Sequence, residues 1–301
     1  MTIFHTPAEW RELRPQNTTI GFVPTMGALH EGHLALVKTA LAQCEHAVVS
    51  IYVNPTQFNN PEDFEKYPKT FHDDCQMLEA IGCGFVFAPT YETLYPDGYR
   101  YRMTETQTST LLEGAHRPGH FEGMLTVVLK LLNCIQADAA FFGEKDFQQL
   151  LLVKEMTESL HHPTKIVPCP TIREPDGLAM SSRNRRLTPA QRALAAKWAQ
   201  TLADLSLTCD EAAQKLEALG FTVDYIAEHW GRRLGAVHTP PLDNGPIVRL
   251  IDNVALLPPA PFSQSWEERE RGAESLLLPS SQPASAGLAP RGYPGAGGGG
   301  S

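Results

Sequence analysis

The stretch that most constrains the fold is 20–42, where an apolar run, a glycine-bearing turn and a helix-forming run follow one another. Residues 20–23 are typical of a buried strand, and 34–42 have the composition of a helix. The first N–H groups of a helix have no partner within it and carry the positive end of its dipole. A strand, a turn and a helix in this order therefore predict an anion site at the turn.

Two glycines and two histidines give this turn its chemical character. Gly27 and Gly32 lack the side chains that would keep a phosphate away from the backbone. His30 and His33 project on one side of a helical first turn, where both imidazoles can donate hydrogen bonds to phosphate oxygens. The same spacing alone also fits a surface turn, and a zinc site is less favoured because no cysteine lies near. The flanking strand and helix favour the anion site.

Strand and helix signals alternate along the first part of the chain. Strands are predicted at 20–23, 47–53, 85–88, 139–142 and 165–167. Helices are predicted at 33–44, 70–81, 122–135 and 145–160. This alternation predicts an α/β fold with a Rossmann-like, doubly wound parallel sheet and helices on both faces. Ligands bind such sheets outside the carboxyl ends of the strands.

Polar loops follow several of these strands and supply cations and amides. The loops are 54–59, 116–121, 143–149 and 177–184. The side chains suited to phosphates, carboxylates and hydroxyls are Lys145, Arg117, Arg183, Gln57 and Gln149. Any one loop alone is best interpreted as solvated, whereas four loops at one end of a sheet predict a binding site.

Charge and cysteine content narrow the classes of protein. The formal net charge of −9 argues against a nucleic-acid binder. The six cysteines form no Cys-x-x-Cys pair, a pattern that favours reduced thiols. Residues 1–10 are polar, and no apolar run approaches the roughly 20 residues that span a bilayer. We therefore expect a cytoplasmic protein that binds no membrane.

Six short motifs occur in one order between residues 20 and 254. They are Val-Pro-Thr-Met-Gly-Ala-Leu-His-Glu-Gly-His (23–33), Asn-Pro-Thr-Gln-Phe (54–58), Arg-Pro-Gly-His-Phe (117–121), Phe-Gly-Glu-Lys-Asp-Phe-Gln-Gln (142–149), Gly-Leu-Ala-Met-Ser-Ser-Arg-Asn (177–184) and Arg-Leu-Ile-Asp-Asn (249–253). Together they resemble the pantothenate synthetase (pantoate–β-alanine ligase) family of the nucleotidyltransferase superfamily. Six motifs in order are far more specific than any one of them.

The resemblance implies an ATP-dependent amide ligation in two steps. The carboxylate of pantoate attacks the α-phosphorus of ATP, which gives pantoyl-adenylate and pyrophosphate. The amine of β-alanine then attacks the mixed anhydride, which yields pantothenate and AMP. Adenylation turns a poor acyl donor into a good one, so the protein mainly aligns reactants and stabilises charge. The resemblance also implies a homodimer.

The resemblance assigns roles to residues by position. The catalytic set is His33, His30, Lys145 and Arg183. The ATP-binding set is Pro24, Thr25, Met26, Gly27, Ala28, Leu29, His30, Glu31, Gly32, His33, Gly143, Glu144, Lys145, Asp146, Ile172, Met180, Ser181, Ser182 and Arg183. The substrate-binding set is Gln57, Gln149, Asn54 and Arg117, with the two glutamines holding pantoate.

No metal ligand is predicted. Mg²⁺ is expected to arrive bound to ATP and to keep several waters, so a dedicated protein cage is not expected. Asp73 and Asp74 could touch the ion, but they are better interpreted as carboxylates on a helix surface.

Composition and resemblance together divide the chain into three parts. Residues 1–173 are expected to bind ATP and pantoate, 174–257 to form a smaller C-terminal α/β lid, and 258–301 to be a disordered tail. Half of the tail is Pro, Gly or Ser, which cannot bury enough apolar surface to become ordered. Its last five residues, Gly-Gly-Gly-Gly-Ser, resemble an engineered linker.

The expected lid departs from the family pattern. Its helical part is predicted at 189–219 and looks shorter than usual, and strands are predicted at 223–226 and 247–255. The stretch between them, 235–246, is rich in Gly and Pro where the family has an apolar strand. The sequence therefore predicts a compact lid and leaves open whether the lid closes over ATP.

Two other classes stay open. Another nucleotidyltransferase would share the histidine turn, but it is not expected to carry the 54–58 and 142–149 motifs together. A catalytically silent scaffold acting through its tail would have no need of His30, His33 or Lys145. Incubation with ATP, Mg²⁺ and pantoate, with and without β-alanine, separates the three.

Overall fold

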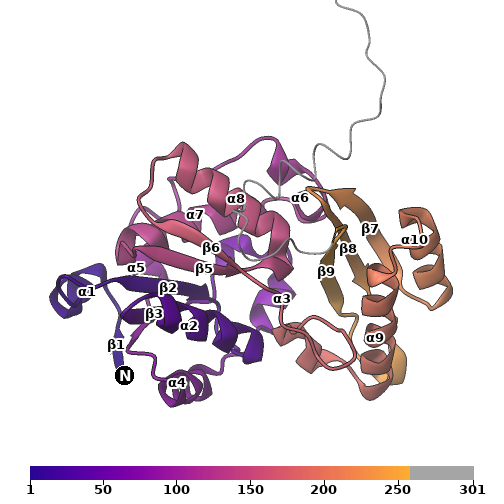
Figure 1. Ribbon diagram of the computed structural model, residues 1–301, viewed down its shortest axis with the longest axis horizontal. Coiled ribbons are helices and arrows are strands. Elements are labelled where there is room, and N and C mark those ends of the chain that lie inside the picture. The colour runs from indigo at the N-terminus through magenta and orange to yellow at the C-terminus, as the bar shows by residue number, and fades with distance from the viewer. Residues whose placement is uncertain (258–301) are drawn as a thin grey trace, which may run out of the picture. The chain divides into compact units, whose positions relative to one another are not determined.

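A six-stranded parallel sheet organises the first part of residues 1–257, the range that the computed structural model describes (Figure 1). Its strands are β1 (Thr2–Phe4), β2 (Ile20–Thr25), β3 (His46–Ile51), β4 (Phe85–Phe87), β5 (Ala139–Gly143) and β6 (Lys165–Cys169). Their order across the sheet is β1-β4-β3-β2-β5-β6, and each pairing is parallel. The predicted α/β fold with a doubly wound sheet is confirmed.

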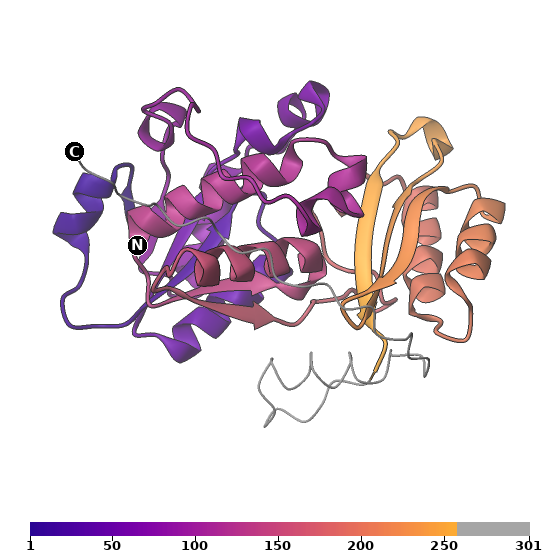
Figure 2. The same ribbon diagram turned by 90° about the horizontal axis from the view of Figure 1, so that it is seen from above.

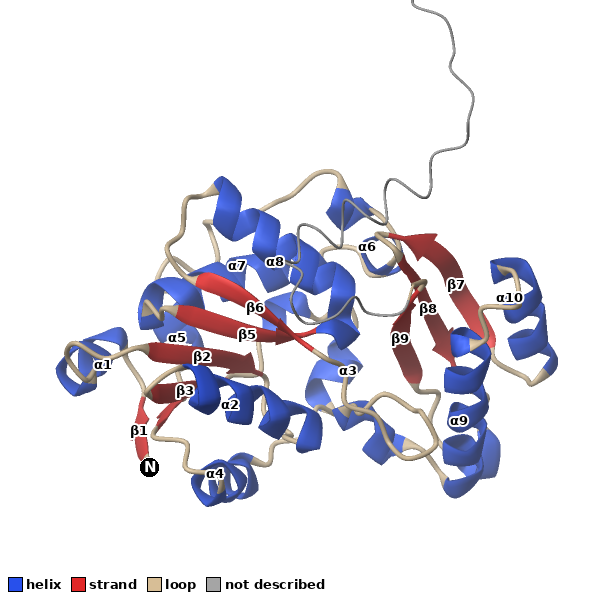
Figure 3. Ribbon diagram, viewed as in Figure 1, coloured by secondary structure: helices blue, strands red, loops and turns tan. Residues whose placement is uncertain are grey.

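Helices cover both faces of this sheet. They are α1 (Pro7–Leu13), α2 (Glu31–Gln43), α3 (Pro61–Glu65), α4 (Phe71–Ala80), α5 (Tyr91–Leu94), α6 (Glu113–His116), α7 (His120–Ile135) and α8 (Phe147–Ser159). Short 3₁₀ segments lie at Pro55–Gln57, Thr108–Thr110, Glu144–Asp146, Ser182–Arg186 and Leu242–Asn244. Helices α2 and α4 lie on one face, and α7 and α8 lie on the other (Figure 3).

The core under α2 explains why the apolar runs form adjacent strands. Val23, Val49 and Val86 come from three neighbouring strands, and none of them is exposed to solvent. Leu34 and Val37 of α2 pack against them, three residues apart on one side of the helix. Each fully buried side chain of this kind contributes about 1.5–3 kcal/mol of transfer free energy.

The strand order reverses between β2 and β5. From β2 the chain proceeds to β3 and β4 on one side, and it later returns to β5 and β6 on the other. The segments after β2 and β5 therefore leave in different directions and open a crevice at the carboxyl edge. The histidine-bearing turn follows β2, and the 3₁₀ segment Glu144–Asp146 follows β5, so both reach this crevice.

A second sheet lies beyond the carboxyl ends of the first (Figures 1 and 2). Its antiparallel strands are β7 (Thr222–His229), β8 (Arg232–His238) and β9 (Arg249–Ala255), in the order β7-β8-β9. Helices α9 (Pro189–Ala203) and α10 (Cys209–Ala218) pack on it. The predicted smaller C-terminal α/β element is confirmed.

Strand β8 corrects the prediction that 235–246 lacks an apolar strand. Gly235 lies inside β8, and Trp198 of α9 packs against it. A Cβ added at Gly235 would lie 2.6 Å from Cη2 of Trp198, so the missing side chain makes room for the indole. A glycine inside a strand here serves a close approach between helix and sheet.

Most helix boundaries lie within two residues of those predicted, and α2 and α7 each begin two residues earlier than expected. Two further differences have a local cause. The helix expected from 145 begins at Phe147, because the three preceding residues form the 3₁₀ segment. The helical run expected at 189–219 is two helices, and each begins with a capping box, at Thr188 with Gln191 and at Thr208 with Glu211. The second capping box is a sequence signal for the break between the helices.

Residues Met1–Pro258 form one compact unit that contains both sheets. The division into domains after residue 173 therefore stays a prediction, and the expected disordered tail, 258–301, lies outside the described residues. None of the helices in residues 1–257 has the length and apolar character that crossing a membrane requires.

Candidate active site

A cavity of about 230 Å³ lies at the carboxyl edge of the large sheet. Its floor is apolar and comes from α7 and β5, including Met124, Val128, Leu131 and Phe141. Its wall is polar and holds most of the predicted site residues. These are Pro24, Thr25, Met26, His30, Gly32, His33, Asn54, Gln57, Arg117, Gly143, Lys145, Asp146, Gln149, Ile172, Met180, Ser181, Ser182 and Arg183. The four polar loops expected at one end of the sheet therefore converge on one cavity.

Five residues of the predicted ATP-binding set do not line this cavity: Gly27, Ala28, Leu29, Glu31 and Glu144. Ala28 and Leu29 are fully buried in the turn after β2. Glu31 is exposed, and its carboxylate lies 3.8 Å from Nζ of Lys38. Glu144 lies 3.4 Å from the guanidinium of Arg232. For these residues direct contact with ATP stays a prediction, since they lie outside the cavity wall.

Asp74 of α4 explains why the first part of the turn does not face the cavity. Its two carboxylate oxygens accept hydrogen bonds from the backbone N–H groups of Ala28 (2.9 Å) and Leu29 (2.8 Å). Its side chain is buried, so the prediction of a surface carboxylate is wrong for Asp74. Gly27 has φ +76°, and a Cβ there would lie 2.9 Å from Asp74 Oδ2. The missing side chain of this glycine therefore makes room for Asp74.

His30 and His33 do reach the cavity together, as predicted. Their ring centroids are 4.1 Å apart. His30 is the N-cap of α2, and its Nδ1 accepts a hydrogen bond from the N–H of Gly32 (3.1 Å). Since Nδ1 is the acceptor, the proton of the neutral ring is on Nε2. Nδ1 of His33 is buried and makes no hydrogen bond within residues 1–257.

Burial keeps both imidazoles uncharged. It lowers the pKa of His30 to about 4, helped by the charges of Lys145 and Arg185. It lowers the pKa of His33 to about 3, helped by His30 and the same two cations. At neutral pH both rings therefore act as neutral hydrogen-bonding groups and add no charge of their own.

The pH dependence of the reaction follows from these values. Both pKa values lie below the usual 6.5, so neither histidine titrates between about pH 6 and about pH 8. We expect kcat for adenylation to show no acidic limb from these groups in that range. The free energy of unfolding, in contrast, is expected to fall as the pH drops below about 6.5. There the two histidines bind protons in the unfolded chain but stay neutral in the folded chain. A kcat profile with an apparent pKa near 6.5 that disappears in His33→Ala would contradict the assignment.

Asn54 and Gln57 form one unit after β3. Nδ2 of Asn54 donates to Oε1 of Gln57 (3.1 Å), and Oδ1 of Asn54 accepts from the hydroxyl of Tyr95 (2.9 Å). Asn54 is 1% exposed, so its position suits holding Gln57 better than wide contact with a ligand. Among residues 1–257, Nε2 of Gln57 donates only to the weakly accepting sulfur of Met26 (3.0 Å). The side chain of Gln149 makes no hydrogen bond with any described residue.

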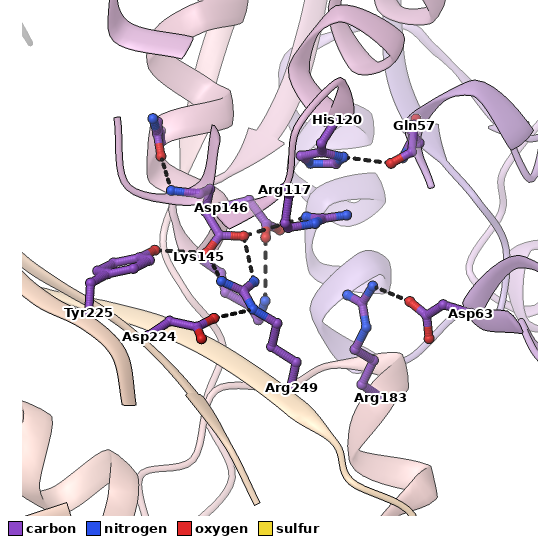
Figure 4. Close-up of polar contacts among 12 residues, drawn as sticks. Gln57, Asp63, Arg117, His120, Lys145, Asp146, Arg183, Asp224, Tyr225 and Arg249 are labelled. Atoms are coloured by element: carbon purple, nitrogen blue, oxygen red, sulfur yellow. Dashed lines mark hydrogen bonds and ion pairs between the residues drawn. The ribbon is translucent and has the colours of Figure 1, made fainter. Parts of the chain in front are cut away.

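The three predicted cations each have a carboxylate partner (Figure 4). Nη2 of Arg183 donates to Asp63 Oδ2 (3.1 Å), and Asp63 also accepts from Arg186 (2.7 Å). Nζ of Lys145 lies 3.4 Å from the adjacent carboxylate of Asp146. The partner of Arg117 is a buried glutamate on α6, at 3.5 Å. A phosphate that binds Arg183 therefore has to compete with Asp63, a partner that no sequence motif indicated.

The predicted loop 116–121 is only partly a loop. Helix α6 ends at His116 and α7 begins at His120, so the connection is short. His120 is buried, and its Nδ1 donates to the backbone oxygen of Gln57 (2.8 Å). His120 thus supports the backbone of Gln57, a role that the motif alone did not reveal. Tyr67 also lines the cavity and was missed, because it lies outside all six motifs.

Glu113 links helix α6 to the second sheet through buried charges. Its carboxylate accepts two hydrogen bonds from the guanidinium of Arg249 on β9 (2.7 and 2.8 Å) and one from the hydroxyl of Tyr225 on β7 (2.8 Å). Burial acts to raise the pKa of Glu113, but the bonds and charge of Arg249 hold it at about 2. The second sheet is therefore fixed beside the cavity by an ionised pair.

A resident metal site has no support among the described side chains. Within residues 1–257, no three His, Cys, Asp or Glu side chains come together in a group that could hold a metal ion.

Comparisons with known proteins agree on one family. The family model for pantoate-beta-alanine ligase matches residues 2–255. A pantothenate synthetase of Bdellovibrio bacteriovorus is 50% identical over 257 residues, which cover 84% of this chain and 99% of that protein. A pantothenate synthetase of Legionella pneumophila is 44% identical over 261 residues, or 85% of this chain and all of that protein.

Solved structures show the same similarity. The crystal structure of a pantoate-beta-alanine ligase from Francisella tularensis, complexed with beta-gamma ATP and beta-alanine, is 39% identical with a TM-score of 0.79. It covers 85% of this chain and 98% of that one. A pantothenate synthetase from Thermus thermophilus is also 39% identical, with a TM-score of 0.75 over 86% of this chain and all of that one.

Proposed function

Because this chain belongs to the pantoate–β-alanine ligase family, we propose that it condenses pantoate with β-alanine, using ATP, to form pantothenate, AMP and pyrophosphate. The observation that carries the proposal is the convergence of two neutral histidines, a lysine and two glutamines on one cavity. These residues are His30, His33, Lys145, Gln57 and Gln149. Another nucleotidyltransferase would need the histidine turn but not the paired glutamines.

In the first step the cavity aligns pantoate with ATP. The amide of Gln149 and the Nε2 of Gln57, which donates to the weakly accepting sulfur of Met26, bind the hydroxyls and carboxylate of pantoate, and the apolar floor suits its branched carbon skeleton. The carboxylate oxygen then attacks the α-phosphorus, and the bond between the α-phosphorus and the bridging oxygen to pyrophosphate breaks. His30, His33 and Lys145 are placed to donate hydrogen bonds to the charge that develops on the phosphate oxygens.

In the second step the amine of β-alanine attacks the carbonyl carbon of pantoyl-adenylate, and AMP leaves. A partly closed cavity favours this step because water, a competing nucleophile, has limited access to the anhydride. The complex of the Francisella tularensis ligase with beta-gamma ATP and beta-alanine supports the use of both ligands by this family.

Several further points belong to the same proposal. Mg²⁺ enters as the complex with ATP, and its charge assists phosphate binding.

Residues 174–257 act as a lid that brings Met180 and Arg183 to ATP, which is supported by their place in the cavity wall. The family resemblance supports a homodimer, and the six free cysteines suit the reducing cytoplasm.

Product analysis tests the proposed function. The purified protein is incubated with MgATP, pantoate and β-alanine, and pantothenate and AMP are quantified by mass spectrometry. We expect equal amounts of both products, and none when pantoate is left out. A parallel reaction with CTP controls for a nucleotidyltransferase of another specificity. Formation of ADP in place of AMP, or no product at all, would contradict the proposal.

A further inference from the structure

We infer that Asp74 is a positioning residue of the active site, which holds the turn after β2 so that His30 and His33 face the cavity. The inference deepens the proposed function and rests on it, because it concerns how the two histidines are placed. Asp74 itself does not line the cavity. It acts from helix α4, which is 46 residues away in sequence from Ala28.

The turn has an unusual backbone that needs support. Gly27 has φ +76° and Ala28 has φ +52°, so two successive residues adopt the left-handed region. For a residue with a Cβ this conformation costs about 1–2 kcal/mol, and such strain persists only when surrounding contacts hold it. Successive left-handed and turn residues direct their N–H groups into one concavity that binds an anion. The structure fills that concavity with a carboxylate of the protein.

Both oxygen atoms of the Asp74 carboxylate accept hydrogen bonds, and each accepts one from a backbone N–H of the turn. Oδ2 of Asp74 accepts from the N–H of Ala28 (2.9 Å) and from the hydroxyl of Thr70 (3.1 Å). Oδ1 accepts from the N–H of Leu29 (2.8 Å). Asp74 is 2% exposed, and no lysine or arginine among residues 1–257 forms an ion pair with it. Its charge is therefore stabilised mainly by the turn that it holds.

The turn that Asp74 holds is followed immediately in the chain by His30 and the first turn of α2, which carries His33. Leu29 precedes His30, the N-cap residue of α2, so the direction of the His30 ring depends on where the turn ends. The N–H groups of Ala28 and Leu29 are taken by Asp74 and are not available to ATP. The N–H of Gly32 is likewise taken, by Nδ1 of His30 (3.1 Å), so the phosphate contacts expected from this turn fall to the two imidazole rings. The anion site expected from the sequence is therefore centred on His30 and His33 at the start of α2.

The variant Asp74→Asn tests the inference with little change in shape. An amide keeps one acceptor oxygen, so one of the two backbone N–H groups meets an –NH₂ donor and loses its partner. We expect kcat for adenylation to fall at least about 10-fold, since small misplacement of catalytic groups costs this much or more. The Kd of pantoate, measured by calorimetry, is expected to stay within about twofold because the glutamines are on other loops. Glu79→Gln, on the exposed side of the same helix, is the matched control and should leave both values unchanged.

The effect must depend on the histidines if Asp74 acts through them. In a His33→Ala background we expect Asp74→Asn to lower kcat by no more than about threefold. A full loss in that background would overturn the inference, because the two residues would then act independently. Recovery of the Asp74→Asn rate at raised Mg²⁺ would also overturn it, since Asp74 would then act on the metal.

A measurement without substrate separates this inference from the proposed function. Asp74→Asn should speed amide hydrogen exchange at least about 10-fold at Ala28 or Leu29, whichever N–H loses its acceptor, while the melting temperature stays within a few degrees. Unchanged exchange at both amides would refute the role of Asp74 in the turn. If the wild-type protein forms no pyrophosphate, the proposed function fails, whereas the exchange result still decides whether Asp74 holds the turn.

Discussion

Replacing His33 with alanine is expected to lower kcat for adenylation at least about 100-fold. The imidazole is a preorganised, uncharged hydrogen-bonding group in a largely buried site, and loss of one such donor to developing charge costs about 10²–10³ in rate. Binding of pantoate should change little, because its expected partners are glutamines on other loops. Initial rates of pyrophosphate release at saturating ATP and pantoate give kcat directly. His72→Ala, which removes an exposed histidine of α4, is the control.

Replacing Gln149 with alanine should give the opposite pattern. Its amide lines the cavity without a partner among the described residues, so its loss is expected to raise the KM of pantoate more than it lowers kcat. Steady-state rates over a range of pantoate concentrations separate the two constants. Equal and mild effects from His33→Ala and Gln149→Ala would mean that binding and chemistry have been assigned to the wrong residues.

Replacing Arg249 with methionine is expected to lower the free energy of unfolding by about 3 kcal/mol or more. The change removes the main partner of Glu113 and leaves a carboxylate in a site where it is 6% exposed. Breaking a buried ion pair from one side is costly for this reason. Urea denaturation followed by circular dichroism measures the loss. Adenylation should also weaken, because β9 supplies Ile251 to the cavity wall.

A surface ion pair provides the matched control for this prediction. Arg102 lies 3.1 Å from Glu122, and its side chain is 52% exposed. Arg102→Gln should therefore lower stability by less than about 1 kcal/mol. Adding Glu113→Gln to Arg249→Met should restore part of the lost stability, since the unpaired charge disappears. Losses of similar size from Arg102→Gln and Arg249→Met would show that Glu113 does not anchor the second sheet.

Five of the six strands of the large sheet were predictable because their signals are local, whereas β1 (Thr2–Phe4) was not predicted. A β-branched run, a turn and a helix-forming run occur within a few residues of one another, and each matches one strand or helix of the structure. The second sheet was harder to predict, because its strand β8 contains Gly235. The glycine is suited to this strand because Trp198, from a helix distant in sequence, packs closely against it. A glycine that admits an indole and a glycine that makes a turn look alike in a sequence.

The candidate site shows the same limit. Its loops were predicted to meet because parallel strands present their carboxyl ends at one edge. The residues that hold those loops were missed or misread, because they depend on contacts between distant segments. Asp74 was interpreted as a surface carboxylate, and Asp63 and Glu113 were not singled out at all. Each becomes visible only when the chain is folded and its oxygen atoms meet N–H groups or guanidinium groups.

Isotope exchange between pyrophosphate and ATP tests the central claim most directly. The protein is incubated with MgATP, labelled pyrophosphate and pantoate, and β-alanine is left out. If pantoate is adenylated before the amine reacts, label enters ATP, because the first step reverses on the enzyme. Exchange should require pantoate and should fall at least about 100-fold in His33→Ala. Absence of exchange with pantoate alone, in a preparation that makes pantothenate when β-alanine is added, would contradict the pantoyl-adenylate route.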